Sequence, residues 1–323
     1  MKRITFIKLA TLAVALSLTG PLQAQTYPSK PVKFIVPFSP GGLPDTVARL
    51  LGANLQAATG QPFVIDNKAG ANGSIAAAAL VQAPADGYTF LISDGASLAI
   101  APVLLTKLPY DPEKDFAPVS LIGTAPLFLA VNANVKANTL DELIALAKAK
   151  PGTLNYGSAG NGSIHHLTAE AMKAGFGVDV AHIPFKGSGV SVPAMIGAQV
   201  DMVFASPPSL MGFVKSGQAK LLAVNSAKRS PLAPDVPTLG EKLPGFDFAF
   251  TLPVIARAGT PREAIDKISS EIARIVRQPD VAQQLQMAGV DPIGGTPEQL
   301  SKALQEEAKR ITAAARHANL KPQ

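Results

Sequence analysis

Two glycine-rich turns hold the residues of this chain whose types and spacing could bind a ligand. The first, SPGG at 39–42, comes shortly after the apolar run VKFIV, and the second, SAGNGS at 158–163, follows LNYG. Apolar residues at helical spacing follow each turn, and the first N–H groups of a helix have no acceptor within it. Those donors and the helix dipole favour an anion, while glycine lets the backbone approach it closely. The turns are therefore predicted to present backbone N–H groups to a small anion, most simply a carboxylate.

Phosphate binding and a purely structural role are the alternatives for these turns. Residues 157–162, GSAGNG, have the spacing GxxGxG rather than GxGxxG, and neither turn ends in the GK[ST] of a P-loop. Nucleotide binding is therefore disfavoured. Ordinary strand-to-helix connections also use glycine, but two such turns at matching places in the chain favour a shared ligand.

Serines and histidines around the second turn leave nucleophilic catalysis open. The residues concerned are Ser158, Ser163, Ser188, His165, His166 and His182. A Ser-His-Asp set is recognised by its geometry, and the chain has no GxSxG elbow. A neutral histidine that orients the turn is the favoured interpretation of the adjacent pair at 165 and 166. Adjacent residues on a helix point about 100° apart, so one is expected to face the cleft and the other the lobe, and a shared metal ion is not expected.

The first residues of the chain predict export. Lys2, Arg3 and Lys8 are followed by an apolar stretch at 9–19 and by a small-residue cleavage site, LQA, at 22–24. This is the pattern of a secretory signal peptide, because the apolar run is too short to span a bilayer. Cleavage is expected after Ala24, which lowers the formal net charge from +6 to +3 and leaves no basic patch that suggests nucleic acid. The chain has no cysteine, which excludes disulfides and thiolate metal sites.

Hydrophobic periodicity divides the rest of the chain into two units with the same order of strands, glycine turns and helices. In the first unit the strands are expected at 32–36, 63–66 and 88–93, and the helices at 45–58 and from residue 74. In the second unit the strands are expected at 154–158, 180–185 and 202–206, and the helices at 163–173 and 192–196. Asp45 and Ser163 are the predicted N-caps after the two turns. Apolar strands separated by helices are typical of parallel sheets covered on both faces, the doubly wound α/β class.

The C-terminal segment predicts a discontinuous first lobe. Thr260-Pro261 and Thr296-Pro297 are helix start signals, and their helices are expected to return to the first unit. PLFLAVN at 126–132 and FDFAFTLPVIARA at 246–258 are the candidates for strands that pass between the units. The predicted organisation is a signal peptide at 1–24, a first lobe at 25–124 and 249–323, and a second lobe at 125–248. Ligands of parallel sheets bind at the carboxyl ends of the strands, which places both glycine turns at a cleft between the lobes.

At this point a family resemblance becomes definite. It is carried by YPSKPVKFIVPFSPGGLPDTVAR, VIDNKAGANGSIAAAALVQAPADGYTFLI, YDPEKDFAPVSLIG, LNYGSAGNGSIHHLTAE, IPFKGSG and APDVPTLGE. With these stretches in this order, the chain resembles the Bug-type extracytoplasmic solute receptors, the substrate-binding components of tripartite tricarboxylate transporters. The resemblance covers nearly the whole mature chain.

The resemblance implies a two-lobed periplasmic binding protein, type II-like, that closes on a small organic carboxylate and delivers it to membrane permease subunits. It implies a receptor rather than an enzyme, without cofactor or metal, and we expect a monomer. In the family the turns after the first strand of each lobe hold a carboxylate with backbone and hydroxyl groups, partly through ordered water. The ligand-binding residues predicted for this chain are Ser39, Pro40, Gly41, Gly42, Leu43, Asp45, Ser93, Ser158, Ala159, Gly160, Gly162, Ser163 and Ser206.

Two departures from the family bear on the ligand. Many relatives carry Asp or Asn where this chain has Ala205, so an amino-acid ligand is less expected here. Relatives often place Trp or Tyr near Phe250, and this chain has no Trp, which leaves the ligand's length open. Neither turn contains an arginine, so recognition is expected without a bidentate guanidinium clamp. The alternatives are a secreted serine hydrolase using Ser158 or Ser163, and a periplasmic ligand sensor for a signalling kinase.

Overall fold

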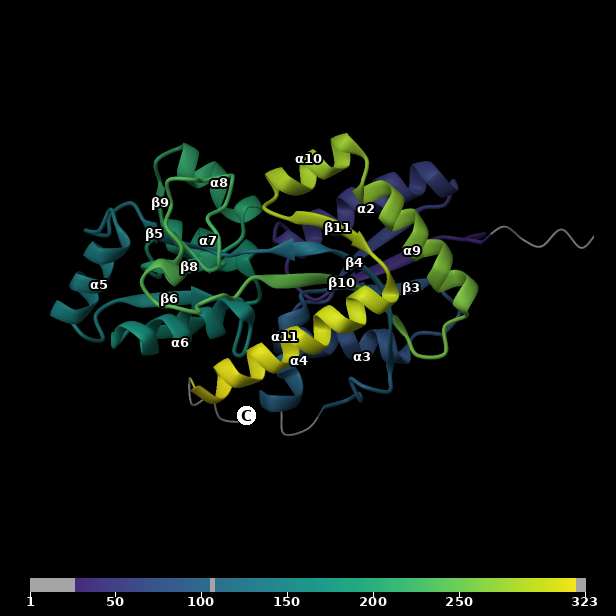
Figure 1. Ribbon diagram of the computed structural model, residues 1–323, viewed down its shortest axis with the longest axis horizontal. Helices are drawn as coiled ribbons and strands as arrows, with labels where there is room; N and C mark the ends of the chain where they lie inside the picture. Colours follow the sequence, from purple (N-terminus) through teal and green to yellow (C-terminus); the bar gives the residue numbers. More distant parts are fainter. Residues whose placement is uncertain (1–26, 105–107, 318–323) are drawn as a thin grey trace, which may run out of the picture.

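The computed structural model describes residues 27–104 and 108–317, so the predicted signal peptide lies outside the described residues. The described chain forms two β-sheets with helices packed around them, which confirms the α/β prediction. In Figure 1 the five-stranded sheet lies on the left and the six-stranded sheet on the right. Within this part of the chain, no helix combines the length and the hydrophobicity needed to cross a bilayer.

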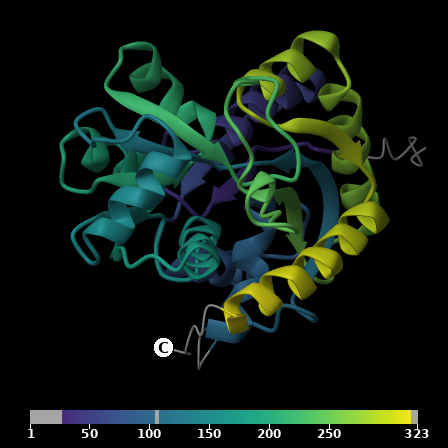
Figure 2. The ribbon, with the colours of Figure 1, turned by 60° about the vertical axis from the view of Figure 1, so that its left-hand side comes forward.

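The six-stranded sheet has the strand order β11-β4-β10-β3-β1-β2. Its strands are β1 (Val32–Val36), β2 (Phe63–Asn67), β3 (Thr89–Ile92), β4 (Phe116–Ala125), β10 (Phe250–Arg257) and β11 (Asp291–Gly295). The helices of the same chain segments are α2 (Leu43–Thr59), the short η1 (Ala71–Gly73), α3 (Ser74–Gln82), α4 (Gly95–Leu104), α9 (Arg262–Val276), α10 (Pro279–Met287) and α11 (Pro297–His317). Helix α11 packs against α4 and β4 and also reaches helix α6 beside the other sheet (Figure 2).

The five-stranded sheet has the order β7-β6-β8-β5-β9. Its strands are β5 (Phe128–Asn132), β6 (Asn155–Ser158), β7 (Ala181–Pro184), β8 (Met202–Ala205) and β9 (Ala219–Val224). The helices of this segment are α5 (Leu140–Ala149), α6 (Ile164–Phe176), α7 (Ser188–Ile196), α8 (Pro207–Lys215) and the short η2 (Leu239–Glu241). The largest apolar cluster of the protein runs through both sheets and includes Phe34 and Phe90 from one and Leu129 and Phe204 from the other.

The six strands predicted for the two units are all present, each ending within one residue of its expected limits. The strands that helices separate in each unit pair in parallel, as predicted. The crossing strands do not: β10 runs antiparallel to β3 and β4, and β5 runs antiparallel to β8 and β9. The chain enters β5 and β10 directly from the other sheet rather than through a helical crossover, which only parallel neighbours require. Helix α11 begins at Pro297 as predicted, but α9 begins at Arg262 with Pro261, not Thr260, as its N-cap.

A buried asparagine ties the two crossings between the sheets together. Leu127, on the way from β4 to β5, donates its N–H to Oδ1 of Asn225 at 2.7 Å. Nδ2 of Asn225 donates to the carbonyl of Phe248, on the way back to β10, at 3.0 Å. The backbone of Asn225 also bonds to both residues, and the side chain is fully buried. One amide side chain therefore holds the outgoing and returning segments side by side.

Removing this amide is expected to destabilise the fold. In Asn225→Ala, the buried Leu127 N–H and Phe248 carbonyl lose their partners, at a cost on the order of 3 kcal/mol. The midpoint of urea-induced unfolding, followed by circular dichroism, measures the loss. Asn134→Ala is the matched control, because Asn134 is exposed, and it is expected to change stability by less than about 0.5 kcal/mol. Equal midpoints for the two variants would contradict the role of Asn225.

Two buried acids lie near the crossing strand β10. Glu307 of α11 accepts hydrogen bonds from the backbone N–H and the hydroxyl of Thr251, and it is 2% exposed. Burial, together with the nearby charge of Asp94, raises the pKa of Glu307 to about 7 despite those hydrogen bonds. Burial likewise raises the pKa of Asp94 to about 6. The folded protein therefore holds a proton here that the unfolded chain releases at lower pH.

Because of these buried acids, the free energy of unfolding should decrease as pH rises. Between the ordinary pKa of 4.5 and the folded value of about 7, the folded state binds more protons, so the free energy of unfolding decreases with pH. Glu307→Gln removes this dependence. As the pH is raised from 5 to 8, the free energy of unfolding of the variant minus that of the wild type should increase by on the order of 1 to 3 kcal/mol. Urea unfolding at several pH values measures the difference. The exposed neighbour variant Glu306→Gln is the control, and a difference independent of pH would refute the assignment.

Candidate functional site

The first glycine turn is held by an acidic side chain from within its own helix. The N-cap of α2 is Gly42, so the prediction that Asp45 is the N-cap is wrong. Pro44 is well suited to the first turn of a helix, and α2 accordingly begins two residues earlier than predicted. Asp45 instead reaches back and accepts the N–H of Gly41 at 3.0 Å. The amide of Gly41 thus has a protein partner.

The charge of Asp45 is balanced locally. Its carboxylate contacts the Arg49 guanidinium at 2.9 Å and accepts a hydrogen bond from Nδ2 of Asn67 at 3.0 Å. Burial alone would raise the pKa of Asp45, but the hydrogen bonds from Arg49, Gly41 and Asn67 hold it below its usual value. Asp45 is therefore ionised and neutralised by Arg49, so it adds little repulsion toward an anion near the turn. The N–H groups of Leu43 and Asp45 precede any acceptor within α2.

The second glycine turn is held in the same way by serine and histidine. Ser163 is the N-cap of α6, as predicted, and its hydroxyl accepts the N–H of His166 and donates to the carbonyl of Gly160. The Gly160 N–H donates to Oγ of Ser158 at 3.0 Å, and the Gly162 N–H donates to Nδ1 of His166 at 2.9 Å. Both glycines have positive φ, 125° and 74°, which other residues rarely adopt. The turn amides again have internal partners.

A stack of aromatic rings packs beside the second glycine turn. The rings of His166 and His182 lie parallel at 4.0 Å, and Tyr156 stacks on His182 at 4.8 Å. Burial lowers the pKa of His166 and, with the nearby His166, lowers the pKa of His182 to about 4. Both rings are neutral near pH 7, which His166 Nδ1 requires in order to accept the Gly162 N–H. This confirms that a neutral histidine orients the turn.

The same geometry disfavours the hydrolase alternative. Oγ of Ser158 lies 2.6 Å from Nε2 of His182, a separation that a Ser-His pair would need. Ser158 is fully buried, however, and its hydroxyl also bonds to the backbone of Gly160. Among residues 27–104 and 108–317, no carboxylate is hydrogen-bonded to His182 to orient it. The pair therefore fits a role in shaping the turn.

The first turn meets a third glycine turn, KGSG at 186–189, across the space between the sheets. The N–H and hydroxyl of Ser39 both point to the carbonyl of Lys186, at 3.3 and 2.9 Å. Ser209 of α8 donates to the carbonyl of Gly41 at 3.3 Å and lies 3.0 Å from the hydroxyl of Ser188. A Cβ on Gly189 would be 2.2 Å from the carbonyl oxygen of Pro40. The two sheets are thus in direct polar contact at the first turn.

The predicted site residues do not all lie at one place. Ser39, Pro40, Gly41 and Gly42 meet the 186–189 turn, and the carbonyl of Phe185 would lie 3.3 Å from a Cβ on Gly160, which links that turn to the residues at 158–163. Ser206 is the N-cap of α8, one turn before Ser209. Ser93 is buried, and its N–H donates to Pro253 in the crossing strand. Leu43 and Ala159 are buried beside their turns.

Sequence reasoning missed Lys186, Ser188 and Ser209 as residues that join the two sheets. The glycines at 187 and 189, which follow the strand expected at 180–185, were the available signal for Lys186 and Ser188. Ser209 gave none, because it lies in the first turn of a helix with no glycine motif.

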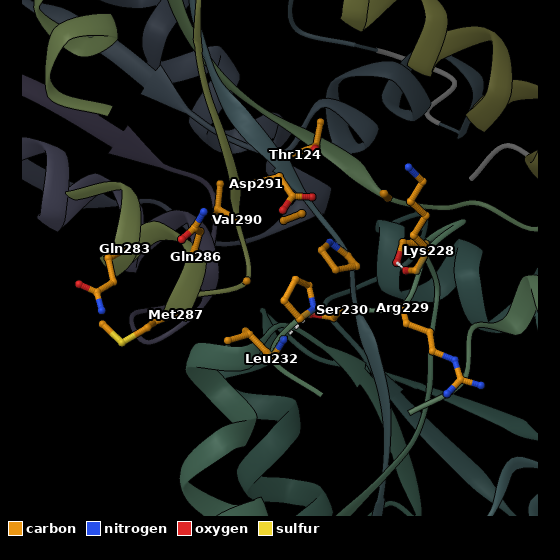
Figure 3. Close-up of a pocket in the computed structure, with 16 residues that line it drawn as sticks. Thr124, Lys228, Arg229, Ser230, Leu232, Gln283, Gln286, Met287, Val290 and Asp291 are labelled. Atoms are coloured by element: carbon orange, nitrogen blue, oxygen red, sulfur yellow. Dashed lines mark hydrogen bonds between the residues drawn. The ribbon is translucent and has the colours of Figure 1, made fainter. Parts of the chain in front are cut away.

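A cavity of about 400 Å³ lies elsewhere, where the chain crosses between the sheets (Figure 3). Its walls come from the end of β4, the loop after β9, α10 and the start of β11. Lys228, Asp291, Gln283 and Gln286 supply its polar groups. None of the predicted ligand-binding residues lines it, so it is separate from the three glycine turns.

Comparisons with known proteins show what this chain is similar to. The family model described as "Tripartite tricarboxylate transporter family receptor" matches residues 47–320. Protein BugT of Bordetella pertussis is 35% identical over 318 residues, covering 97% of this chain and 98% of that protein. A Rhodopseudomonas palustris protein solved with adipate has 33% identity and a TM-score of 0.89, covering 92% of this chain and 100% of that one. MatC of the same organism, with bound malate, has 32% identity and a TM-score of 0.83, covering 89% and 99%.

The contact between the first turn and the 186–189 turn can be tested with an engineered disulfide. A Cβ on Gly42 would lie 3.3 Å from Oγ of Ser188. Because Oγ is one bond away from the Cβ of Ser188, two cysteine Cβ atoms at these positions could reach the ~3.5–4.5 Å found in disulfides. The natural chain has no cysteine, so the double variant Gly42→Cys with Ser188→Cys should form one intramolecular bond. Mass spectrometry with and without reductant detects it. Gly42→Cys with the exposed Ser216→Cys should stay reduced, and equal behaviour of both pairs would contradict the contact.

Proposed function

The chain belongs to the tripartite tricarboxylate transporter receptor family, and we propose that its ligand is a small aliphatic carboxylate held between the two sheets. The function is capture of that solute in the periplasm and delivery to membrane permease subunits. The relatives solved with adipate and with malate support an aliphatic dicarboxylate as the ligand. Ala205 has no polar group to pair with a ligand ammonium group.

The observation that carries this proposal is a set of backbone N–H groups that have no acceptor within their turn or their helix. The amides of Leu43 and Asp45 in α2, and those of Ile164 and His165 in α6, come before any acceptor within their helices. The other polar groups of the turns are already paired with one another. The positive ends of two helices then supply the attraction for an anion, and the neutral histidines and the Asp45–Arg49 pair add no net charge.

Ligand capture would proceed by closure of two lobes about the crossing strands. We assign residues 25–124 and 249–323 to one lobe and 125–248 to the other, with the segments around Asn225 as the hinge. Closure of this kind is a common response to a ligand, and a ligand that prefers the closed form increases its population. The hydrogen bonds of Ser39 and Ser209 would form only in the closed state, so they add to its stability without contacting the ligand.

The proposed site of action is the periplasm. Family membership supports this location, and cleavage of a signal peptide after Ala24 would deliver the protein there. The buried Ser158 hydroxyl, occupied by backbone contacts, supports binding without turnover. We expect the mature protein to act as a monomer.

A thermal-shift experiment with adipate, malate and citrate tests this function. A ligand that binds only the folded state stabilises it by about 2.7 kcal/mol at a hundredfold excess over Kd. Ile164→Pro should abolish the shift, because it removes one amide at the first helical position, where proline is tolerated. Ser163 already has the extended conformation that precedes proline, with φ −62° and ψ 157°.

Ile164→Val is the matched control, because it keeps the amide while also trimming the buried side chain. It should retain the ligand shift. No shift for any of the acids with the wild-type protein would overturn the proposed function, and equal shifts for the two variants would overturn the role of the α6 amides.

A further inference from the structure

One buried histidine has an unsatisfied ring nitrogen. His165, the second residue of α6, is 8% exposed, and its Nδ1 has no hydrogen-bond partner. Its neighbours His166 and His182 each have a partner for one ring nitrogen: Nδ1 of His166 accepts the Gly162 N–H, and Nε2 of His182 contacts the Ser158 hydroxyl. Buried polar atoms are nearly always paired in native proteins. The exception at His165 therefore calls for a partner from outside the chain.

The covalent geometry of the side chain limits where this nitrogen can lie. Nδ1 is bonded to Cγ and is the ring nitrogen nearer the backbone, so it lies close to the first turn of α6. The amides of Ile164 and His165, in the same turn, also precede any acceptor within the helix. Ser163 caps the turn and uses its hydroxyl for His166 and Gly160, so it does not supply the missing group. Three unsatisfied polar groups thus gather at one end of one helix.

The chemistry of the three groups is that of a carboxylate site. Burial lowers the pKa of His165 to about 4, so the ring is neutral at neutral pH and carries one N–H and one bare nitrogen. With the proton on Nδ1, the ring and the two amides are three donors, and a carboxylate is an acceptor with two oxygens. Two donors from the backbone would hold one end of a carboxylate, and the imidazole would complete its hydrogen bonds.

We propose that His165 contacts the ligand through Nδ1–H and, with the amides of Ile164 and His165, determines which acid the second lobe accepts. The proposal rests on the proposed function and adds to it a specificity-determining side chain. A ligand must place a carboxylate at the start of α6 to satisfy this nitrogen. An ester or an alcohol at the same place would leave at least one of the three donors without an acceptor.

The test compares two substitutions of this residue in the mature chain. His165→Leu removes both nitrogens, whereas His165→Asn keeps a side-chain N–H close to the position of Nδ1. Isothermal titration calorimetry with adipate and with malate should give a Kd weakened about tenfold or more in His165→Leu, the loss of one hydrogen bond to a charged group. His165→Asn should recover most of the affinity. Leu167→Met, a change of similar size on the same helix, should leave Kd unchanged.

A second readout separates ligand contact from a structural role. His165→Leu buries no unpaired polar atom, so its ligand-free form should unfold at a higher temperature than wild type while binding more weakly. Higher thermal stability with unchanged affinity would overturn the proposal and make His165 a purely structural residue. If the wild-type protein binds neither acid, the proposed function fails instead, and the two outcomes are distinguishable.

The wild-type protein also allows a test that needs no stable variant. The chain has four histidines, and ¹⁵N labelling of their rings lets each Nδ1 be followed by NMR during titration with adipate. Saturation should shift the Nδ1 signal of His165 more than that of His166, whose Nδ1 already accepts the Gly162 N–H. An unchanged His165 signal at saturation would overturn the proposal even if every substituted protein failed to fold.

Discussion

The structure depends on how each glycine turn satisfies its own backbone. Asp45 accepts the Gly41 N–H, Ser158 accepts that of Gly160, and His166 accepts that of Gly162. These bonds hold the three glycines at positive φ, a conformation that other residues rarely adopt. They also remove these turn amides as donors, and the first N–H groups of α2 and α6 are the donors that we propose for an anion. A turn that looks rich in donors is therefore a rigid frame around a few of them.

Neutrality is the second feature of the site. The ring stack of Tyr156, His182 and His166 keeps its imidazoles uncharged by burial, and Arg49 balances Asp45. Helix ends act on an anion through partial charges, and a net charge nearby would outweigh them. The recognition by neutral donors that we propose would lack the strength of a guanidinium clamp, and it would suit a receptor that must also release its solute.

Two of the hydrogen-bonded contacts between the sheets differ in how deeply they are buried. Asn225 ties the crossing segments at one side, and the contact of Ser39 and Ser209 with the opposite turns joins the sheets at the other. The first involves fully buried groups and is expected to persist, because unpaired buried groups are costly. The second involves partly exposed hydroxyls, whose bonds exchange readily with water. This difference is what a hinge and a reversible closure require.

The sequence by itself determined the class of fold, all six strands of the two units and the N-cap at Ser163, because apolar periodicity and glycine turns are local signals. The family followed from a resemblance that covers nearly the whole mature chain. The sequence also identified a neutral histidine as the residue that orients the second turn. The antiparallel strands β5 and β10, the start of α2 at Leu43 and the meeting of Ser39 with Lys186 were decided only in three dimensions. Strand direction depends on how the chain crosses between sheets, and a contact between residues 147 positions apart leaves no trace in local pattern. Whether a given amide is free for a ligand depends on which side chain folds back onto it, and only tertiary structure decides that.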